Sequence, residues 1–494
     1  MTRLSALVAA LGGVPRTASA MMPRDLSNLT AVQAVGAMRR GDITAEQYAQ
    51  FCLMRAEALQ HLNAFITLDP EAVLEAARRA DRRRAAGEPL GPLHGLPLAI
   101  KDNIDTAGVI TSAGTAALRR HRPRSDAPVL APLYAAGAIL LGKTNLHELA
   151  YGYTTNNGAF GPTRNPYDPQ RIPGGSSGGT AVAIAARIAP AGLGTDTNGS
   201  VRVPSALCGI AGLRPSAGRY PGAGIVPISH TRDTAGPMAR TVADLVLLDS
   251  VVTGDASPVE PVALKGLRVG VARGYFWADL DAEVERIASA ALAKLVDAGV
   301  QIVEVDFAPL PADAFKTRRC RAIQLTETRP DLARYLEQHG SSLSVEAVAR
   351  EIATPGVKSV FDRFIFGPEA FTPAQYEAAL HEYRPALQAA FATSFRDGRL
   401  DATLFPMTQV PALAIGQESE FEVRGARFPV LYLGRNTDPG SCAGLPGLAL
   451  HAGMTRDGLP VGIALDSAAG TDRRLLGIGL SIEQVLGRAP APPL

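Results

Sequence analysis

Short apolar runs alternate along the chain with stretches in which apolar residues recur every three or four positions. The apolar runs have the length of buried strands, and the second pattern is typical of helices that pack by one face. Strands are predicted within 91–104, 138–144, 267–272, 301–307, 402–405, 447–452 and 461–465, and helices at 127–136, 241–252, 281–298 and 475–486. The strand–helix–strand order across 267–307 is that of a βαβ unit, so the pattern predicts an α/β protein.

Two helices near the N-terminus carry a start signal of their own. Thr30 and Thr44 are each followed three residues later by a glutamine, Gln33 and Gln47, which is the spacing of a capping box. An N-terminal helical layer follows from this. Farther along, 312–395 has a more polar and irregular helical pattern, which predicts a cap over a functional site.

The first twenty residues resemble a secretory signal. Arg3 precedes the apolar run 4–14, and small residues close the segment at 18–20. The run is short and contains two glycines, and Met21 and Met22 offer a start just before the first helix. We expect a cytoplasmic protein, with export as the alternative if residues 1–20 are a signal peptide.

Charge and cysteine content exclude several classes of partner. The chain of 494 residues has 49 Lys and Arg against 47 Asp and Glu, which argues against nucleic acid or an anionic membrane as partner. No apolar run approaches the roughly 18 residues that span a bilayer. The four cysteines lie far apart and the histidines do not cluster in sequence, so no metal site and no dense disulfide framework are predicted. A small-molecule substrate and a reducing compartment fit best.

Lys101 directly follows the short apolar run within 91–104, so we expect its side chain to lie where water is scarce. Desolvation disfavours the ammonium form, and a neutral lysine can act as a general base near neutral pH. The alternative is a strand-end lysine that reaches solvent or pairs with Asp102 or Asp105.

The stretch 174–205 holds hydroxyl groups in two glycine-marked turns. Ser176 and Ser177 lie between two glycine pairs, a small-residue helical segment follows, and Ser200 lies in the second turn. Such turns can expose a serine oxygen while backbone N–H groups converge on one point, as acyl transfer requires. Flexible loops would use the same glycines, so glycine content alone leaves both readings open.

One apparent nucleotide motif is discounted. Residues 137–144 match the phosphate-binding pattern G-x-x-x-x-G-K-[ST], with Lys143 as its lysine. The four central residues are apolar and strand-like, and an extended, sheet-bonded backbone cannot curl its N–H groups around a phosphate. We predict no nucleotide cofactor here.

Three motifs together carry a family resemblance. They are KDNID with Lys101, GGSSGG at 174–179 and GTDTNGSVRVPSA at 194–206, and Ser200 follows Ser176 by 24 residues. In this order and spacing they resemble the amidase signature family over about 25–255 and 400–488. Within that family, the run at 223–252 is most similar to bacterial mandelamide hydrolases and indoleacetamide hydrolases.

The resemblance implies a fold and a domain layout. The fold is an amidase signature α/β fold, a central mixed β-sheet covered by helices on both faces. A single amidase domain is expected at 25–490, with 312–400 as a variable helical cap-like region. Residues 1–24 would be an N-terminal extension.

The resemblance also implies a catalytic triad without cofactor or metal. Ser200 would be the nucleophile, Ser176 the bridging serine on a cis peptide bond, and Lys101 the neutral base. The oxyanion hole would be formed by backbone N–H groups of Thr197, Asn198, Gly199 and Ser200. Ser177 is expected to be structural support.

One position departs from the family pattern. The family usually has a second glycine where this chain has Asn198. Asparagine tolerates left-handed backbone conformations better than most residues, so we expect the turn to survive.

The implied activity is hydrolysis of a small aryl or arylalkyl amide to a carboxylic acid and ammonia or an amine. The same triad would also serve a carbamate, urethane or ester hydrolase, or the glutamine-hydrolysing subunit of a tRNA-dependent amidotransferase. A non-catalytic binding protein and a Ser-His-Asp hydrolase are weaker alternatives, because the triad is intact and no histidine lies near a G-x-S-x-G elbow. A homodimer is left open.

Overall fold

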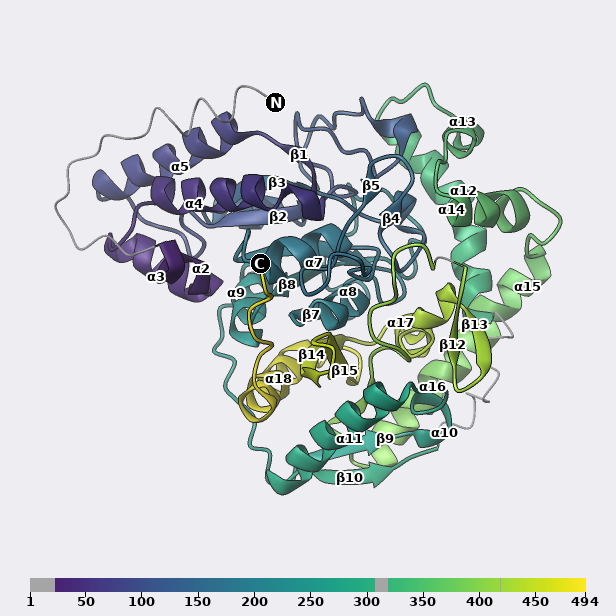
Figure 1. The fold of residues 1–494 in the computed structure, drawn as a ribbon. Helices are drawn as coiled ribbons and strands as arrows, with labels where there is room; N and C mark the ends of the chain where they lie inside the picture. The colour runs from purple at the N-terminus through teal and green to yellow at the C-terminus, as the bar shows by residue number, and fades with distance from the viewer. Residues whose placement is uncertain (1–22, 307–318, 418) are drawn as a thin grey trace.

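The computed structural model describes residues 23–306, 319–417 and 419–494, and its centre is one large sheet (Figure 1). The eleven strands of that sheet are β1 (Phe65–Leu68), β2 (Pro97–Lys101), β3 (Ile139–Thr144), β6 (Ala191–Asp196), β7 (Ala211–Arg214), β8 (Thr234–Ala239), β9 (Arg268–Val271), β10 (Gln301–Glu304), β11 (Ala402–Pro406), β14 (Gly447–Met454) and β15 (Pro460–Asp466). Their order is β1-β3-β2-β6-β8-β7-β14-β15-β11-β9-β10. β2 runs parallel to β3 and β6, whereas neighbours from β6 to β11 are antiparallel, so the sheet is mixed as expected.

Helices cover both faces of this sheet. The α-helices are α2 (Pro23–Asn28), α3 (Ala31–Arg40), α4 (Ala45–Ala58), α5 (Pro70–Ala85), α6 (Ala131–Ala135), α7 (Gly178–Ala185), α8 (Arg202–Leu207), α9 (Val242–Thr253), α10 (Arg273–Phe276), α11 (Ala282–Asp297), α12 (Arg319–Gln338), α13 (Val345–Arg350), α14 (Pro355–Val360), α15 (Pro373–Ala378), α16 (Arg384–Asp397), α17 (Asp438–Ala443) and α18 (Asp472–Leu486). Gly447 of β14 faces Arg202 of α8, while the next residue, Leu448, contacts Gly479 of α18. Because successive strand residues point to opposite faces, α8 and α18 lie on opposite sides. The α/β prediction is confirmed.

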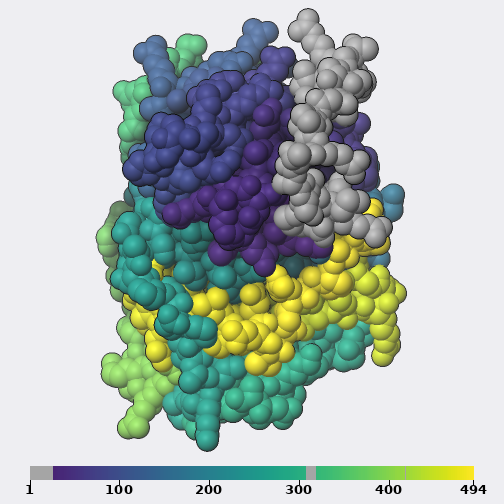
Figure 2. Space-filling model, turned by 90° about the vertical axis from the view of Figure 1, so that its left-hand side faces the viewer, coloured from purple at the N-terminus to yellow at the C-terminus, as the bar shows by residue number. Residues whose placement is uncertain are grey.

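The N-terminal helical layer is present. The side chains of Thr30 and Thr44 each accept a hydrogen bond from the backbone N–H of the glutamine three residues on. The side chain of each glutamine in turn accepts the backbone N–H of its threonine. Helices α4 and α5 pack on each other and on β3 at one end of the sheet. Figure 2 shows the C-terminal segment (yellow) between this layer and the βαβ unit, which joins them into one body.

The βαβ unit predicted at 267–307 is also confirmed. Strands β9 and β10 pair in parallel, from Gln301 opposite Arg268 to Glu304 opposite Val271. Helix α11 connects them, and Asp281 caps its N-terminus through the N–H of Glu283. The last predicted strand residue, Phe307, lies outside the described residues.

A second apolar cluster lies apart from the main core. Helix α12 from Leu325 on, helices α13 and α14 and the π-helical turn η4 (Phe361–Ile365) pack their apolar side chains on residues of 113–118, 146–151 and 226–228. The first turn of α12, with Cys320, and helix α16, with Phe391, belong to the main core. The segment 325–365 thus packs as a separate layer, and the division into domains stays a prediction.

Local differences from the predicted elements have tertiary causes. The helix expected at 127–136 is the single turn α6 (Ala131–Ala135), and the residues just before it form a turn in which Val129 and Leu130 are buried. The chain also forms short hairpins, β4 (Asn156–Asn157) with β5 (Gly161–Pro162) and β12 (Glu420–Val423) with β13 (Ala426–Pro429). Short 3₁₀ or π turns are η1 (Gln60–Leu62), η2 (Ala116–Leu118), η3 (Glu148–Ala150), η5 (Ala379–Tyr383) and η6 (Val430–Gly434). The possible signal at 1–20 lies outside the described residues.

In the described part of the chain, every helix is too short or too polar to cross a lipid bilayer.

Candidate active site

Lys101 ends β2 inside the protein. All five residues of β2 are buried, and the Lys101 side chain is fully enclosed. Its Nζ donates hydrogen bonds to Ser176 Oγ at 2.7 Å and to Thr195 Oγ1 at 2.7 Å. Asp102 instead pairs with Lys143, and Asp105 with His339, so neither is the partner of Lys101. The structure therefore favours the desolvated lysine over the strand-end ion pair.

Burial sets the protonation state of Lys101. It lowers the pKa of the Lys101 ammonium from 10.5 to about 7, although the carboxylates of Asp196 and Asp233 oppose the change. No carboxylate is hydrogen-bonded to Nζ among the residues that the structure describes; its two partners are hydroxyl groups. A large fraction of Lys101 is therefore neutral at pH 7.

The first glycine turn holds Ser176 against Lys101. The peptide bond between Gly175 and Ser176 is cis, as the resemblance implied. The Ser176 carbonyl accepts a hydrogen bond from the N–H of His147 at 3.1 Å. Ser177 bonds instead to strand β6, its Oγ donating to the Thr195 carbonyl at 3.2 Å. The two adjacent serines thus have different surroundings, and only Ser176 contacts the lysine.

Ser200 lies in the second turn, next to the first. The N–H of Ser177 donates to the Ser200 carbonyl at 3.1 Å, which ties the two turns together. Ser200 is 5 % exposed and borders a cavity, whereas Ser176 is fully enclosed. A small molecule in that cavity can reach Ser200 but not Ser176 directly.

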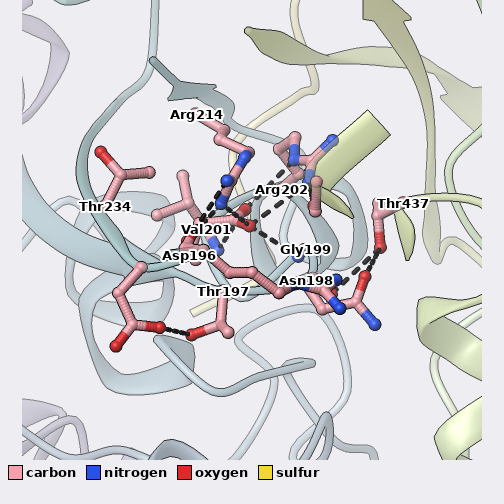
Figure 3. A network of polar contacts seen from close by, with 12 residues as sticks. Asp196, Thr197, Asn198, Gly199, Val201, Arg202, Arg214, Thr234 and Thr437 are labelled. Atoms are coloured by element: carbon pink, nitrogen blue, oxygen red, sulfur yellow. Dashed lines mark hydrogen bonds and ion pairs between the residues drawn. The ribbon is translucent and has the colours of Figure 1, made fainter. Parts of the chain in front are cut away.

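Asp196 organises the turn around Ser200 (Figure 3). Its carboxylate accepts the N–H of Gly199 at 2.6 Å and that of Val201 at 3.2 Å. Arg202 and Arg214 point at the same carboxylate, with N···O distances of 3.1 Å each. All three charged side chains are fully buried.

The two arginines keep Asp196 ionised. Burial alone would raise the pKa of Asp196, but the guanidinium groups of Arg202 and Arg214 outweigh it and hold that pKa well below its ordinary value. A second buried carboxylate, Asp466, lies 3.4 Å from Arg202 and completes the charge balance. The turn that carries Ser200 is therefore fixed by charged hydrogen bonds rather than left as a flexible loop.

Asn198 is accommodated in the Ser200 turn without the left-handed backbone expected of it. Its backbone is not left-handed; the adjacent Gly199 takes the positive φ of 96°. A Cβ on Gly199 would come within 2.5 Å of Thr437 Oγ1. The Asn198 carbonyl accepts hydrogen bonds from Tyr153 Oη at 2.8 Å and from Thr437 Oγ1 at 3.0 Å. Figure 3 shows Thr437 pointing at Asn198.

Of the four predicted oxyanion-hole donors, one is already engaged. The Gly199 N–H is donated to Asp196, so Gly199 serves the turn and not the cavity. The assignment of the oxyanion-hole donors stays a prediction, and the engaged Gly199 N–H makes the other three the better candidates. Thr197 and Asn198 border the cavity together with Ser200.

The cavity beside Ser200 is small and opens into a wider one. The inner cavity has a volume of about 40 Å³, and the outer cavity one of about 650 Å³. They share part of their walls, and the inner one is mainly apolar, with Tyr151, Tyr153, Ile228, Leu325, Val360 and Leu431. Helix α12 contributes Arg321, Gln324 and Leu325 to the inner wall.

His147 is the histidine whose backbone contacts this site, and it is a poor candidate for a base. It is buried, and burial together with the charge of Lys101 lowers the pKa of its imidazole to about 4. Its Nδ1 lies 3.2 Å from Thr154 Oγ1, away from both serines. The geometry therefore favours the lysine over a histidine as proton acceptor.

The segment 137–144 is a strand and not a phosphate loop. Residues 139–144 form β3, and Lys143 Nζ donates to the Ile104 carbonyl at 2.6 Å and to Thr111 Oγ1 at 2.8 Å. Its ion pair with Asp102 is fully buried. Lys143 is thus occupied inside the protein.

The sequence matches those of known proteins over most of its length. The sequence profile of the family described as Amidase matches residues 47–476. The chain belongs to the amidase family. Among amidases, it is 42% identical to the indoleacetamide hydrolase of Agrobacterium vitis over 456 residues, which cover 92% of this chain and 96% of that relative. It is 41% identical to the mandelamide hydrolase of Pseudomonas putida over 490 residues, with 95% and 94% covered.

Solved amidase structures have the same fold. A crystal structure of an amidase superposes with a TM-score of 0.82 at 32% identity, covering 93% of this chain and 100% of that one. The family resemblance drawn from the three motifs is thus confirmed, and the protein is an amide hydrolase.

Several residues of the site were not singled out from the sequence. Thr195 accepts hydrogen bonds from both Lys101 and Asn103, and Asp196 with its two arginines fixes the Ser200 turn. The available signal was the charged pair Asp196 and Arg202 inside an otherwise small and polar motif, where a charge needs a buried partner.

Proposed function

We propose that this amidase works through Ser200, Ser176 and Lys101. Neutral Lys101 takes a proton from Ser176, which takes one from Ser200 as the Ser200 oxygen attacks the amide carbonyl. The relay returns a proton to the leaving nitrogen, and an acyl-enzyme remains on Ser200. Water, deprotonated by the same relay, releases the acid. The observation that supports this most strongly is the 2.7 Å hydrogen bond between Lys101 Nζ and Ser176 Oγ inside the protein.

The oxyanion would be stabilised by backbone N–H groups of Thr197, Asn198 and Ser200. All three residues border the inner cavity, where an amide carbonyl in contact with Ser200 would lie. Asp196 engages Gly199 and so holds the turn in shape before substrate arrives. Donors that are fixed in advance need no reorganisation as charge develops.

The substrate class we infer is a small aryl or arylalkyl amide. The wall beside Ser200 is largely aromatic and aliphatic, and the wider outer cavity leaves room for a ring. Two relatives above 40% identity are named for the hydrolysis of indoleacetamide and mandelamide, which are amides of this kind. An apolar wall with a few polar groups is typical of such sites.

Two alternatives use the same triad. Carbamates, urethanes and esters require the same acyl transfer and differ in the leaving group. Glutamine is disfavoured, since the described residues that line the inner cavity include no carboxylate to pair with its α-ammonium group.

Two alanine variants test the mechanism. Ser200→Ala and Lys101→Ala should each reduce kcat on an aryl amide by at least about 10³-fold while the protein remains folded. Lys294→Ala, at an exposed lysine of α11, is the matched control and should keep the wild-type rate. Near wild-type turnover of Lys101→Ala at pH 7 would refute the lysine relay.

The substrate class is tested separately. We expect the purified protein to hydrolyse indoleacetamide or mandelamide with a higher kcat/KM than acetamide, glutamine or an aryl carbamate of similar size. A preference for the carbamate would move the assignment to the urethanase alternative without changing the triad.

A further inference from the structure

A cluster of two histidines and one carboxylate lies outside the catalytic site. Asp105 follows β2 closely, His121 comes from the loop after η2, and His339 directly follows α12. One ligand atom from each, a carboxylate oxygen and two ring nitrogens, lies within 4.8 Å of the other two. Asp105 is buried, and both histidines are partly buried. These segments are distant in sequence and meet only through the fold.

The hydrogen bonding of His339 leaves its Nε2 without a proton in the neutral ring. Nδ1 lies 2.9 Å from the backbone carbonyl of Tyr335, and a carbonyl can only accept, so Nδ1 carries the hydrogen. Nε2 lies 2.8 Å from Asp105 Oδ2, which accepts no other hydrogen bond. At this distance a positive charge, either a proton on Nε2 or a metal ion, must lie between the ring nitrogen and the carboxylate oxygen.

The surroundings of the cluster match those of metal ligands. Histidines that bind metals generally donate their other N–H to a carbonyl or carboxylate, as His339 does to Tyr335. The phenol of Tyr335 donates to the other oxygen of Asp105 at 2.7 Å, which fixes the orientation of the carboxylate. His121 Nε2 lies 2.9 Å from the same phenol, so the three side chains share one hydrogen-bonded cluster.

We propose that Asp105, His121 and His339 form a binding site for a divalent transition-metal ion of the zinc class. Two imidazole nitrogens and one carboxylate oxygen suit Zn²⁺, Co²⁺ or Ni²⁺ and not Mg²⁺ or Ca²⁺, which prefer oxygen ligands. The partial exposure of His339, 17% of its side chain, gives the ion a route in. Water would complete the coordination.

The ion would act on stability and not on the reaction. It would join His339, at the end of α12, to Asp105, four residues after Lys101. Helix α12 also supplies part of the wall of the Ser200 cavity. Metal binding should therefore stabilise the helical layer over the site and raise Tm.

Binding is tested on the full-length, chelator-treated protein without an affinity tag. Titration with Co²⁺, followed by visible absorption, and with Zn²⁺, followed by calorimetry, should each show one equivalent bound. His121→Gln and His339→Gln should each weaken Zn²⁺ binding by at least about 100-fold and remove the metal-dependent rise in Tm. Amide hydrolysis by the metal-free variants verifies that they are folded.

Three further variants make the outcome decisive. Tyr335→Phe keeps all three ligands but removes the hydrogen bond that orients Asp105, and should weaken Zn²⁺ binding by about tenfold, less than the loss of a ligand. His381→Gln, at an exposed histidine that contacts Glu377, should change nothing. His230→Gln tests the other cluster, with Glu327 and Asp331, and should leave binding unchanged. Undiminished Zn²⁺ binding in His339→Gln, or loss of binding in His230→Gln, would overturn the proposal. Absence of Zn²⁺ binding by the wild type would also overturn it, and a proton would then bridge His339 and Asp105.

Discussion

At Lys101, two hydroxyl groups take the place of a counter-ion. Ser176 and Thr195 both contact its Nζ, and Thr195 also receives a hydrogen bond from Asn103. A hydroxyl oxygen that already accepts two N–H groups fixes the rotation of the lysine amine. When Nζ is neutral, it still donates to Thr195, and its hydrogen bond with Ser176 reverses so that the lone pair accepts the Ser176 hydroxyl proton, as a general base requires.

The pKa of Lys101 predicts the pH dependence of hydrolysis. Since the protonated lysine cannot accept a proton, kcat/KM should fall about tenfold per pH unit below about pH 7 and level off above it. Steady-state rates on an aryl amide from about pH 5 to pH 9 measure this limb. A flat profile across that range would contradict the assignment of Lys101 as the base.

The same pKa affects stability with a defined sign. The folded value of about 7 lies below the ordinary 10.5, so the unfolded chain binds more protons between these two values. The contribution of Lys101 to the free energy of unfolding therefore falls as pH drops from about 10.5 to about 7 and is constant below. Lys101→Met serves as the control, because it should lack this pH dependence in denaturant titrations.

At the level of elements, the connection from β6 to α8 depends on charge. Asp196 ends the strand, and its carboxylate holds two backbone N–H groups of the turn and two arginines. The same few residues thus end a strand, shape the Ser200 turn and begin a helix. A buried charge in this position stabilises only as long as its partners are complete.

Asp196→Asn should destabilise the protein strongly. The amide can still accept from Gly199, but Arg202 then keeps only Asp466 as an ion-pair partner, and Arg214 loses its paired carboxylate. Loss of one partner from a buried ion pair costs about 3–5 kcal/mol, measured as the free energy of unfolding in urea. Asp362→Asn makes the same change in an exposed pair with Lys358 and should have little effect. Equal stability of the two variants would show that Asp196 does not hold the turn.

The sequence predicted those elements whose residues repeat in a pattern. The buried strands at 97–101 and 139–144 and the amphipathic helix at 282–297 were visible because periodicity is local information. Helix α17 could not be predicted in this way, since it lies in a glycine- and proline-rich segment. Its residues are buried and contact Arg202 and Arg232, which are distant in sequence.

Partnerships between distant residues could not be predicted in the same way. An arginine in a motif looks the same whether it faces water or, as Arg202 does, a carboxylate 264 positions away. Likewise, His121 meets Tyr335 across 214 positions, so histidines that seemed scattered in sequence form a cluster in space. The proposed triad could be predicted only because three motifs, each local, carry its members.

On the scale of the whole molecule, two apolar cores support the site from opposite directions. The main core holds the sheet that carries Lys101, and the second cluster holds the helical layer that closes the cavity. Phe361 belongs to the second cluster and packs edge-on against Tyr151, a wall residue, with ring centroids 5.4 Å apart. Phe405 belongs to the main core and stacks on Phe276 at 4.5 Å. Both phenylalanines are fully buried.

Matched substitutions should separate the two cores. Phe361→Leu and Phe405→Leu remove similar volumes, and each should cost about 1–3 kcal/mol locally. Phe361→Leu should raise KM more than it lowers kcat, because it loosens Tyr151 without touching Lys101 or Ser176. Amide hydrogen exchange should then quicken in 325–365 alone, as a unit that opens below global unfolding. Phe405→Leu should instead lower protection throughout the sheet and leave KM nearly unchanged. If both variants quickened exchange over the whole chain to the same degree, the helical layer would be part of one cooperative core and could not open by itself to admit substrate.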